Sequence, residues 1–201
     1  MKHTVGTPLS ALDTIFLRRS IRAFEPRMID DDTIHSLLDA AVQAPTAMHV
    51  EPWAFVVVQD EALLHKYSEA AKVLWTKGDG KHEALHVPRL GRSFAARAAD
   101  PGYSIVHHAG TLIVVCSRST DPFAQADCWL AAENLMLAAT TMGLGTCPIG
   151  FALPALTDPE TKRALGIPAD VTAMAPIIVG VPAGAPPPQQ RREPQIVVWK
   201  E

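Results

Sequence analysis

Hydrophobic positions recur along the first part of the chain at the spacing of helix faces. Residues 9–17 carry an apolar stripe, which predicts a first amphipathic helix that ends beside an arginine pair; the stripe is Leu9, Leu12, Ile15 and Phe16. A second helix is predicted to begin at the aspartates of residues 30–32, which suit a helix N-terminus, and to end before Pro45. Its apolar stripe is Ile34, Leu37, Leu38 and Ala41.

Three short runs rich in β-branched residues have the length and composition of buried strands, and they cover residues 53–59, 111–116 and 173–179. Residues 127–142 are apolar on nearly every face, so we expect a helix that is buried all round, in the core or in a subunit interface. Residues 146–151 are predicted as a turn-rich loop and residues 154–165 as a short helix. Residues 61–108 contain helical pieces and glycine turns without a clear pattern.

The C-terminal segment combines prolines with a short β-prone run. The prolines between residues 182 and 194 favour an extended conformation, and Ile196–Trp199 is predicted as one final strand. Because such an arm has too few apolar neighbours to be ordered alone, we expect it to lie across another surface. Neither an internal repeat nor a domain-breaking linker is evident, so a single domain over residues 1–201 is expected.

Composition and charge narrow the functional classes. The chain has 48% hydrophobic and 19% charged residues, which is a globular composition, and its net charge of -3 argues against a nucleic-acid binder. Three cysteines without a CxxC pair, and no signal-peptide pattern, fit free thiols in a reducing cytoplasm. No stretch reaches the roughly 18 apolar residues of a membrane span, so neither membrane nor nucleic acid is an expected partner.

Arginines gather in two places that suit phosphate binding, because guanidinium groups bind phosphate oxygens bidentately. The first group lies around a serine hydroxyl and comprises Arg18, Arg19, Ser20, Arg22 and Arg27. The second group, Arg191 and Arg192, lies in the C-terminal arm, from which it could close over the same phosphate. Taken alone, each group is more typical of solvated surface charge. The GxGxxG and GxxxxGK[ST] phosphate loops are absent, so neither a Rossmann fold nor a P-loop is expected.

A metal site is a further candidate, because residues 82–86 read HExxH, a spacing that places two zinc-binding histidines on one helix face. Gly78, Gly80 and Pro88 bracket the motif closely, and no third ligand is signalled nearby. We therefore favour a chance match and expect no metal. Hydrolase chemistry has no support either, because no serine lies in a GxSxG elbow and Cys147 has no evident histidine partner.

Taken in order, these segments resemble the nitroreductase superfamily of FMN-dependent oxidoreductases. Residues 17–58 contain its R-R-S turn, a helix, an A-P-T sequence and a P-W-x-F strand, and the family's glycine-rich loop and closing arm match residues 143–151 and 180–199. The resemblance covers nearly the whole chain except residues 61–108. It implies an α+β fold, with a central mixed β-sheet flanked by helices and a domain-swapped C-terminal arm in a homodimer.

The resemblance also implies a cofactor, a reaction and a site. FMN would carry the redox chemistry, NAD(P)H would pass hydride to flavin N5, and an electron-poor small molecule such as a nitroaromatic or quinone would accept it. Water can supply the protons, so no catalytic residue is assigned. The implied flavin contacts are Arg18, Arg19, Ser20 and Arg22 at the ribityl-phosphate and pyrimidine edge; Pro45, Thr46, Ala47, Met48 and His49, with Glu51 beside them, in a loop from the partner subunit; Pro148, Ile149 and Gly150 near N5; and Arg191 and Arg192 at the phosphate.

Two departures from the family pattern affect the flavin environment. Many members have Asn and Gln where this chain has His49 and Glu51. A carboxylate near flavin O2 opposes the negative charge of reduced flavin, so we hypothesise a lowered flavin potential unless a protonated His49 offsets Glu51 or the Glu51 side chain turns to solvent. The chain also lacks the glutamate that some members place between Ile149 and Gly150, which leaves backbone N–H groups as the expected N5 contact.

Two other functions stay open at this level. One is a relative of the same fold with different flavin chemistry, such as reductive dehalogenation, flavin fragmentation or dehydrogenation of a modified peptide. Residues 61–108, as a lid over the substrate, would discriminate between these. The other is a flavin- or metal-binding module without turnover.

Overall fold

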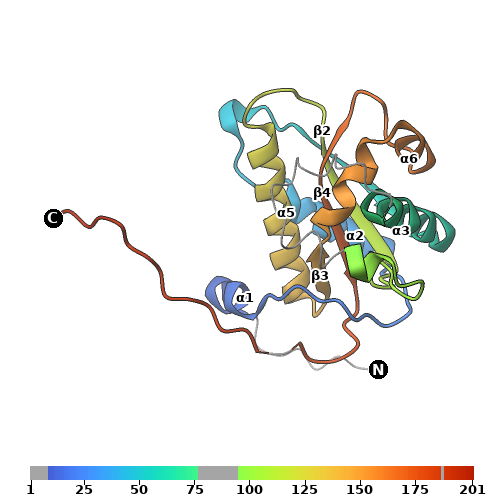
Figure 1. The fold of residues 1–201 in the computed structure, drawn as a ribbon. Coiled ribbons are helices and arrows are strands. Elements are labelled where there is room, and N and C mark those ends of the chain that lie inside the picture. The colour runs from blue at the N-terminus through green and yellow to red at the C-terminus, as the bar shows by residue number, and fades with distance from the viewer. Residues whose placement is uncertain (1–8, 77–94, 187) are drawn as a thin grey trace.

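Four strands form one antiparallel sheet in the computed structural model, which describes residues 9–76, 95–186 and 188–201. In space their order is β1 (Trp53–Val58), β2 (Thr111–Ser117), β4 (Thr172–Gly180) and β3 (Gly145–Pro148). The three β-branched runs predicted as strands are confirmed, and they pair directly with one another (Figure 1). β2 and β4 therefore occupy the centre of the sheet.

Both faces of the sheet are covered, because the central strands are apolar on both sides. Along β2, Leu112, Val114 and Cys116 belong to one core cluster, whereas Ile113 and Val115 belong to the other. Every residue of β2 is buried. A continuous apolar run of this kind is what a strand enclosed between two helical layers requires.

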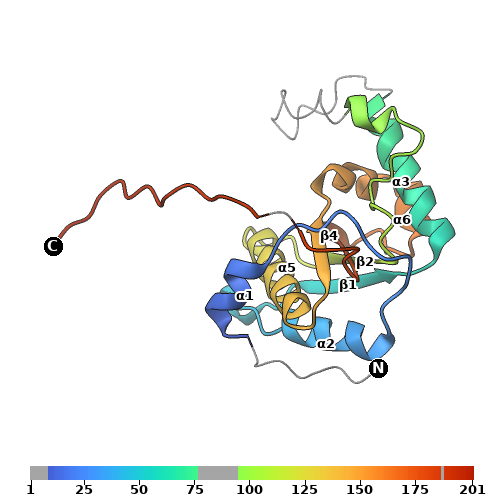
Figure 2. The same ribbon diagram turned by 90° about the horizontal axis from the view of Figure 1, so that it is seen from below.

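Helices form a layer on each face of the sheet (Figure 2). On one face lie α2 (Asp31–Ala41) and α5 (Ala124–Thr141); on the other lie α3 (Glu61–Thr76), the 3₁₀ segment η3 (Gly150–Thr157) and α6 (Pro159–Ala164). The predicted start of α2 is confirmed, because the side chain of Asp30 accepts a hydrogen bond from the Thr33 amide at 2.7 Å. Ile34, Leu37 and Ala41 of the predicted stripe are buried against the sheet and α5.

The first helix, α1 (Ala11–Leu17), is confirmed, but its apolar stripe faces outward. Ser10 caps it through a reciprocal capping box with Asp13. α1 packs on α5, yet Leu12 remains 65% exposed and Phe16 72% exposed. Within the described residues of this single chain, no other segment covers these apolar side chains.

Helix α5 is buried on its sheet-facing side but not all round. Ala131, Ala132 and Leu135 are fully buried, whereas Leu130 is 45% exposed. Complete burial of α5 within the core of one chain, the first alternative of the prediction, is therefore wrong. Its burial in a subunit interface stays a prediction.

A segment that follows α1 runs along the edge of the sheet and joins three distant parts of the chain. Ser20 and Thr146 form an isolated parallel bridge, and the Ile21 N–H donates to the Thr146 carbonyl oxygen at 2.9 Å. Two further hydrogen bonds join the segment to residues 181–183, where the C-terminal arm begins. The Glu25 N–H donates to the Val181 carbonyl at 2.8 Å, and the Ala183 N–H donates to the Ala23 carbonyl at 3.0 Å. We call residues 20–25 the edge segment.

Three local expectations differ from the structure. Residues 145–148 form strand β3, and residues 150–157 continue as 3₁₀ helix, where a turn-rich loop was predicted. The predicted short helix over 154–165 is thus divided between η3 and α6. A mixed sheet was expected, but all four strands pair in antiparallel fashion. Parallel pairing among the described residues is limited to the isolated bridge between Ser20 and Thr146.

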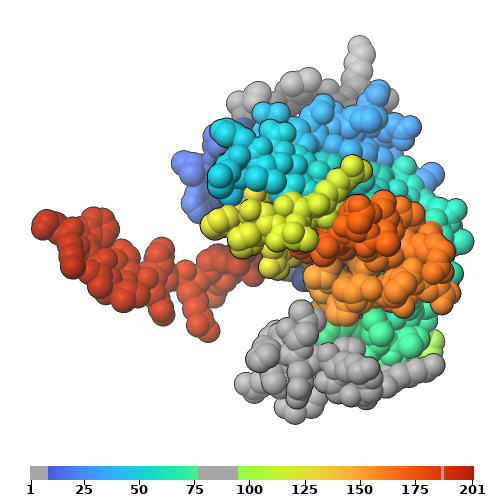
Figure 3. All heavy atoms as spheres, turned by 90° about the horizontal axis from the view of Figure 1, so that it is seen from above, coloured from blue at the N-terminus to red at the C-terminus, as the bar shows by residue number. Residues whose placement is uncertain are grey.

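The C-terminal arm is extended, but its predicted final strand is absent from this single chain. Residues 196–199 pair with no strand among the described residues, and Val197 is 93% exposed. Figure 3 shows the arm leaving the body of the molecule. A β-strand forms by backbone hydrogen bonds to a neighbouring strand, and among the described residues the arm has no such neighbour in its own chain. None of the helices in the described ranges is both long enough and apolar enough to span a bilayer.

Close approach at Gly145 generates a prediction about the edge segment. A Cβ atom on Gly145 would lie 2.7 Å from Ile21 Cγ1 and 2.8 Å from Ile21 Cβ. Because Cβ is fixed to the backbone, a rotamer change cannot relieve the clash, and Gly145→Ala should lower the free energy of unfolding by about 1–3 kcal/mol. Denaturant unfolding of the variant and of the wild type measures this difference in the free energy of unfolding. Gly102→Ala is the control, since its nearest contact would be Asp100 Oδ1 at 3.5 Å; equal stability of the two variants would contradict the predicted clash.

Candidate functional site

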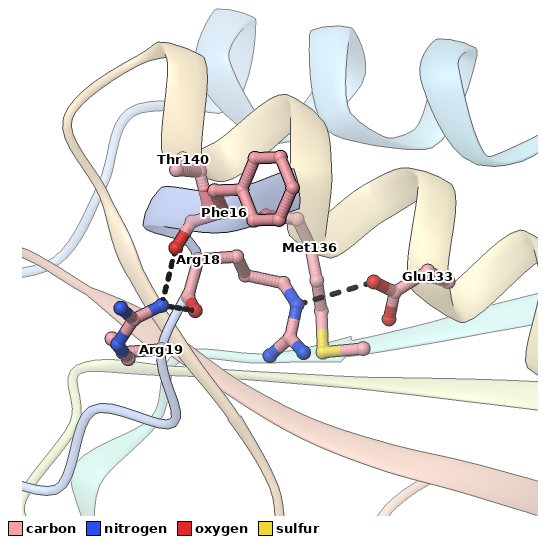
Figure 4. A network of polar contacts seen from close by, with 6 residues as sticks. All are labelled: Phe16, Arg18, Arg19, Glu133, Met136 and Thr140. Atoms are coloured by element: carbon pink, nitrogen blue, oxygen red, sulfur yellow. Dashed lines mark hydrogen bonds and ion pairs between the residues drawn. The ribbon is translucent and has the colours of Figure 1, made fainter. Parts of the chain in front are cut away.

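Arg18 leaves the end of α1 and lies along α5, with its guanidinium turned toward Glu133 (Figure 4). Its Nε donates to Glu133 Oε1 at 3.1 Å, and the Arg18 side chain is only 20% exposed. Glu133, a charged residue in the middle of the largely apolar α5, therefore orients this arginine. No bond of the two Nη atoms is found within the described residues, so they keep their donors for a ligand.

Arg19, for which a flavin contact is predicted, contacts the end of α1 in this single chain. Its Nη1 donates to the carbonyl oxygens of Phe16 at 2.6 Å and of Arg18 at 2.7 Å (Figure 4). These contacts satisfy carbonyl groups at the end of α1, where cations are favoured. In this chain Arg19 stabilises the end of the helix.

The edge segment brings Ser20 and Arg22 against β3, beside two of the three predicted residues near flavin N5. Arg22, Pro148 and Ile149 line the same cavity of about 290 Å³. Two parts of the predicted site, more than a hundred residues apart in sequence, therefore meet in one chain. Cys147, which precedes Pro148 on β3, is buried. Cys116 and Cys128 are buried as well, and all three thiols are free, as expected.

Burial and the charges of nearby arginines together set the pKa values of two groups in this cavity, and burial has the larger effect. Burial raises the pKa of the Cys147 thiol, and the charges of Arg22 and Arg18 and a hydrogen bond with Ser20 oppose that rise. His107, on the cavity wall, has its pKa lowered to about 4, first by burial and then by the charges of Arg22 and Arg97. His107 is therefore neutral at physiological pH.

Arg97, Tyr103 and His107 are among the cavity residues that sequence reasoning missed. The Arg97 guanidinium carbon lies 4.8 Å from the centre of the Tyr103 ring, and the Tyr103 and His107 rings are 5.7 Å apart in an edge-to-face arrangement. They lie in the stretch 61–108, whose pattern was unclear. No spacing in the sequence signals them, because tertiary contacts bring them to β3.

The loop predicted to reach the flavin from the partner subunit lies elsewhere on the chain, at the start of α5. It contains the 3₁₀ turn η1 (Ala47–His49), and the Ala47 N–H donates to the Asp127 carboxylate at 3.2 Å and 3.3 Å. Met48, His49 and Glu51 have positive φ values of 54°, 55° and 47°. Non-glycine residues in this region are strained, and such strain is common at binding sites.

Within one chain this loop does not join the arginines. Pro45, Met48, His49 and Glu51 are exposed, and Thr46 and Ala47 are half-buried. No hydrogen bond or ion pair between residues 45–51 and residues 18–22 is found in the part of the chain that the structure describes. The figures place the loop at the N-terminal end of α5, whereas α1 packs beside its C-terminal half (Figure 1).

The second arginine pair is also separate in this chain. Arg191 and Arg192 are exposed on the extended arm. The expectation that both arginine groups meet at one phosphate involves two subunits and stays a prediction. The HExxH motif, residues 82–86, lies outside the described residues, and no group of metal-ligating side chains was found among the residues described.

The fold and the site define an α+β protein with a sheet between two helical layers and a cationic site at one sheet edge. The profile of the nitroreductase family matches residues 15–181. The chain is 31% identical over 176 residues to an Archaeoglobus fulgidus protein named as a candidate NADH dehydrogenase/NAD(P)H nitroreductase; the match covers 85% of this chain and 84% of that protein. The chain therefore belongs to the nitroreductase family.

Solved structures agree with this assignment. A nitroreductase with bound FMN from Bacteroides fragilis superposes with a TM-score of 0.80 at 30% identity, covering 96% of this chain and 100% of the other. Oxidised iodotyrosine deiodinase, bound to FMN and 3-iodo-L-tyrosine, superposes with a TM-score of 0.71 at 23% identity, covering 96% and 100%. At that identity the second likeness concerns the fold alone.

Proposed function

We propose that the protein is an FMN-dependent oxidoreductase that takes hydride from NAD(P)H and passes it to an electron-poor acceptor such as a nitroaromatic or quinone. The observation that carries this proposal is the docking of the edge segment on β3. It places Arg22 in the same cavity as Pro148 and Ile149, and Arg18 lies two residues before it. Family membership and the FMN of the Bacteroides fragilis relative support the same conclusion.

The residues present fit a flavin phosphate. Arg18 keeps its Nη donors, and Ser20 contributes a hydroxyl, so charge-assisted and neutral donors lie in one short stretch. When bound, FMN accepts hydride at N5 and releases it to the acceptor. The chain binds and orients both co-substrates, and no side chain is required to move a proton.

One backbone group is suited to the N5 edge. The Ile149 N–H already donates to the Pro176 carbonyl at 2.9 Å, so it is not available to a ligand. Gly150, the first residue of η3, is exposed, and no described atom lies within 4 Å of where its Cβ would be. The N–H groups at the start of a helix have no partner inside the helix, so Gly150 is the donor that we assign to N5.

Completion of the site requires a second subunit in this proposal. The exposed apolar residues of α1, the outer side of α5 and the arm would be covered in a homodimer; they include Leu12, Phe16, Leu130, Val197 and Trp199. The strained loop at residues 45–51 and the arm with Arg191 and Arg192 would then reach the partner's edge segment. The homodimer also gives the predicted strand at residues 196–199 a backbone to pair with.

Cofactor content and turnover test the function directly. The purified protein should bind about one FMN per chain and consume NADH or NADPH when a nitroaromatic or quinone is supplied. Arg18→Gln should weaken FMN binding by about 10- to 150-fold, since a hydrogen bond to a charged group contributes about 1.5–3 kcal/mol. Arg27→Gln is the control, because Arg27 is paired with Glu25 on the exposed surface. Protein that cannot be reconstituted with FMN would refute the proposal, and turnover of a halogenated aromatic alone would favour the dehalogenase alternative.

Removal of residues 186–201 should cost both the dimer and the flavin, because the arm supplies interface and phosphate contacts together. Analytical ultracentrifugation and flavin absorbance measure the two losses. The double variant Arg191→Gln/Arg192→Gln separates them: it should remain dimeric and bind FMN more weakly. A truncated protein that stays a yellow dimer would contradict the role of the arm.

Glu51→Gln should raise the midpoint potential of the bound flavin, since a carboxylate at the pyrimidine edge disfavours the negative charge of the reduced form. Redox titration of the two proteins at the same pH measures the difference. Glu25→Gln, which removes a carboxylate paired with Arg27, is the matched control. An unchanged potential would show that Glu51 points to solvent.

A further inference from the structure

Asp127 is a buried acidic residue in the first turn of α5, and its side chain bonds outside the helix. The residue is 5% exposed, and its two carboxylate oxygens accept the Ala47 N–H at 3.2 Å and 3.3 Å. Among the described residues, its carboxylate accepts no hydrogen bond from an amide of α5 itself. Burial of a carboxylate is costly unless the group is paired or hydrogen-bonded. The bond to Ala47 therefore explains why an acidic side chain lies at this position.

Few hydrogen bonds hold residues 45–51, which contain η1 and connect α2 to β1; we call them the η1 loop. Just before the loop, the Asn134 side chain of α5 donates to the Ala40 carbonyl of α2 at 3.3 Å. In the ranges that the structure describes, the bond between Ala47 and Asp127 is the one hydrogen bond that joins the η1 loop to another element. Helix α5 thus fixes the end of α2 with one side chain and the η1 loop with another.

The η1 loop needs such fixation because its backbone is strained. Met48, His49 and Glu51 have the left-handed φ values that non-glycine residues rarely adopt. Met48 is 89% exposed, so packing within the single chain does not hold its side chain. Residues in this conformation persist only where the surrounding structure fixes them. The carboxylate of Asp127, next to the strained residues, supplies that fixation.

We propose that Asp127 is a positioning residue: by holding the Ala47 amide, it keeps the η1 loop in the conformation that meets FMN across the subunit interface. This inference rests on the proposed function, in which the loop reaches the flavin of the partner subunit. Asp127 acts through the loop and is assigned no flavin contact. Without its carboxylate the loop samples other conformations, and FMN binds only the fraction of molecules that keep the competent one. Helix α5 then serves both flavin sites of a dimer, because its Glu133 orients Arg18 of the chain's own site.

FMN affinity, measured without turnover, tests this role. Flavin is removed from full-length wild type and from Asp127→Ala, and FMN is titrated back while its fluorescence is followed. We expect Asp127→Ala to bind FMN about tenfold more weakly. Asp127→Asn keeps an oxygen acceptor in the same place and should recover most of that loss. Equal losses in the two variants would assign the effect to the charge and overturn positioning by the hydrogen bond. If Asp127→Ala does not fold, Asp127→Ser, whose hydroxyl is one bond shorter than the carboxylate, takes its place with the same expected loss.

Amide hydrogen exchange of the flavin-free protein gives a second readout that does not depend on the cofactor. In Asp127→Ala, exchange in residues 45–51 should rise more than exchange in β2. Cys128→Ala is the matched control, because Cys128 is the next residue of α5, is fully buried, and donates from Sγ to the Cys116 carbonyl at 3.5 Å. This control should lower the melting temperature yet leave FMN affinity and loop exchange as in wild type. Equal effects in the control would reduce the role of Asp127 to general stability.

The two readouts together separate the inference from the proposed function. A loss of FMN affinity with faster loop exchange supports the positioning role. Wild-type exchange would show that Asp127 does not hold the loop, and faster exchange with wild-type FMN affinity would show that the loop does not serve the flavin; either result refutes the inference. Protein that binds no FMN, but whose loop exchanges faster in Asp127→Ala, would refute the flavin function while the hold of Asp127 on the loop stands.

Discussion

The docking of residues 20–25 along the edge of β3 is the constraint on which the rest of the site depends. Backbone hydrogen bonds hold this segment to Thr146 and to Val181, and two glycines let its side chains approach. At Gly180 a Cβ would lie 2.9 Å from the Phe24 ring. The segment also covers the edge strand, whose unpaired backbone would otherwise invite pairing with other chains. Protection of the sheet and placement of the arginines thus have the same cause.

The same docking explains why a single subunit carries an unfinished surface. α1 precedes the edge segment and the arm follows β4 directly, so both are anchored close to the arginines and project from that edge. The apolar side chains of α1 and of the arm have the spacing of buried faces, but they are exposed in the single chain. Apolar surface of this extent is stabilised by association. A partner that covers it would also supply the parts of the proposed flavin site that one chain keeps apart.

The sequence predicted those features that depend on local pattern. Apolar runs predicted strands over residues 53–59, 111–116 and 173–179, which agree with the observed β1, β2 and β4 to within one residue at each end, and a cap predicted the start of α2. Strand β3 was missed because Gly145 and Pro148 are residues typical of turns, and here tertiary pairing with β4 overrides that preference. Arg22 was identified within its motif, but Arg97 and His107 have no partner at a fixed sequence spacing. Only the fold brings them to β3, so no single-sequence pattern could have found the cavity.

Backbone strain is distributed in a way that agrees with these assignments. Among the described residues, the non-glycine positions with left-handed φ are Met48, His49, Glu51, His107 and His108. Each costs on the order of 1–3 kcal/mol, and a chain keeps such residues only where the surrounding structure fixes them. All five lie in two loops, and none lies within the sheet or its long helices. One loop is the segment that the proposal gives to the partner's flavin, and the other includes His107, which lines the cavity beside β3. Among the described residues, left-handed non-glycine backbone is therefore confined to two loops that would lie near ligands.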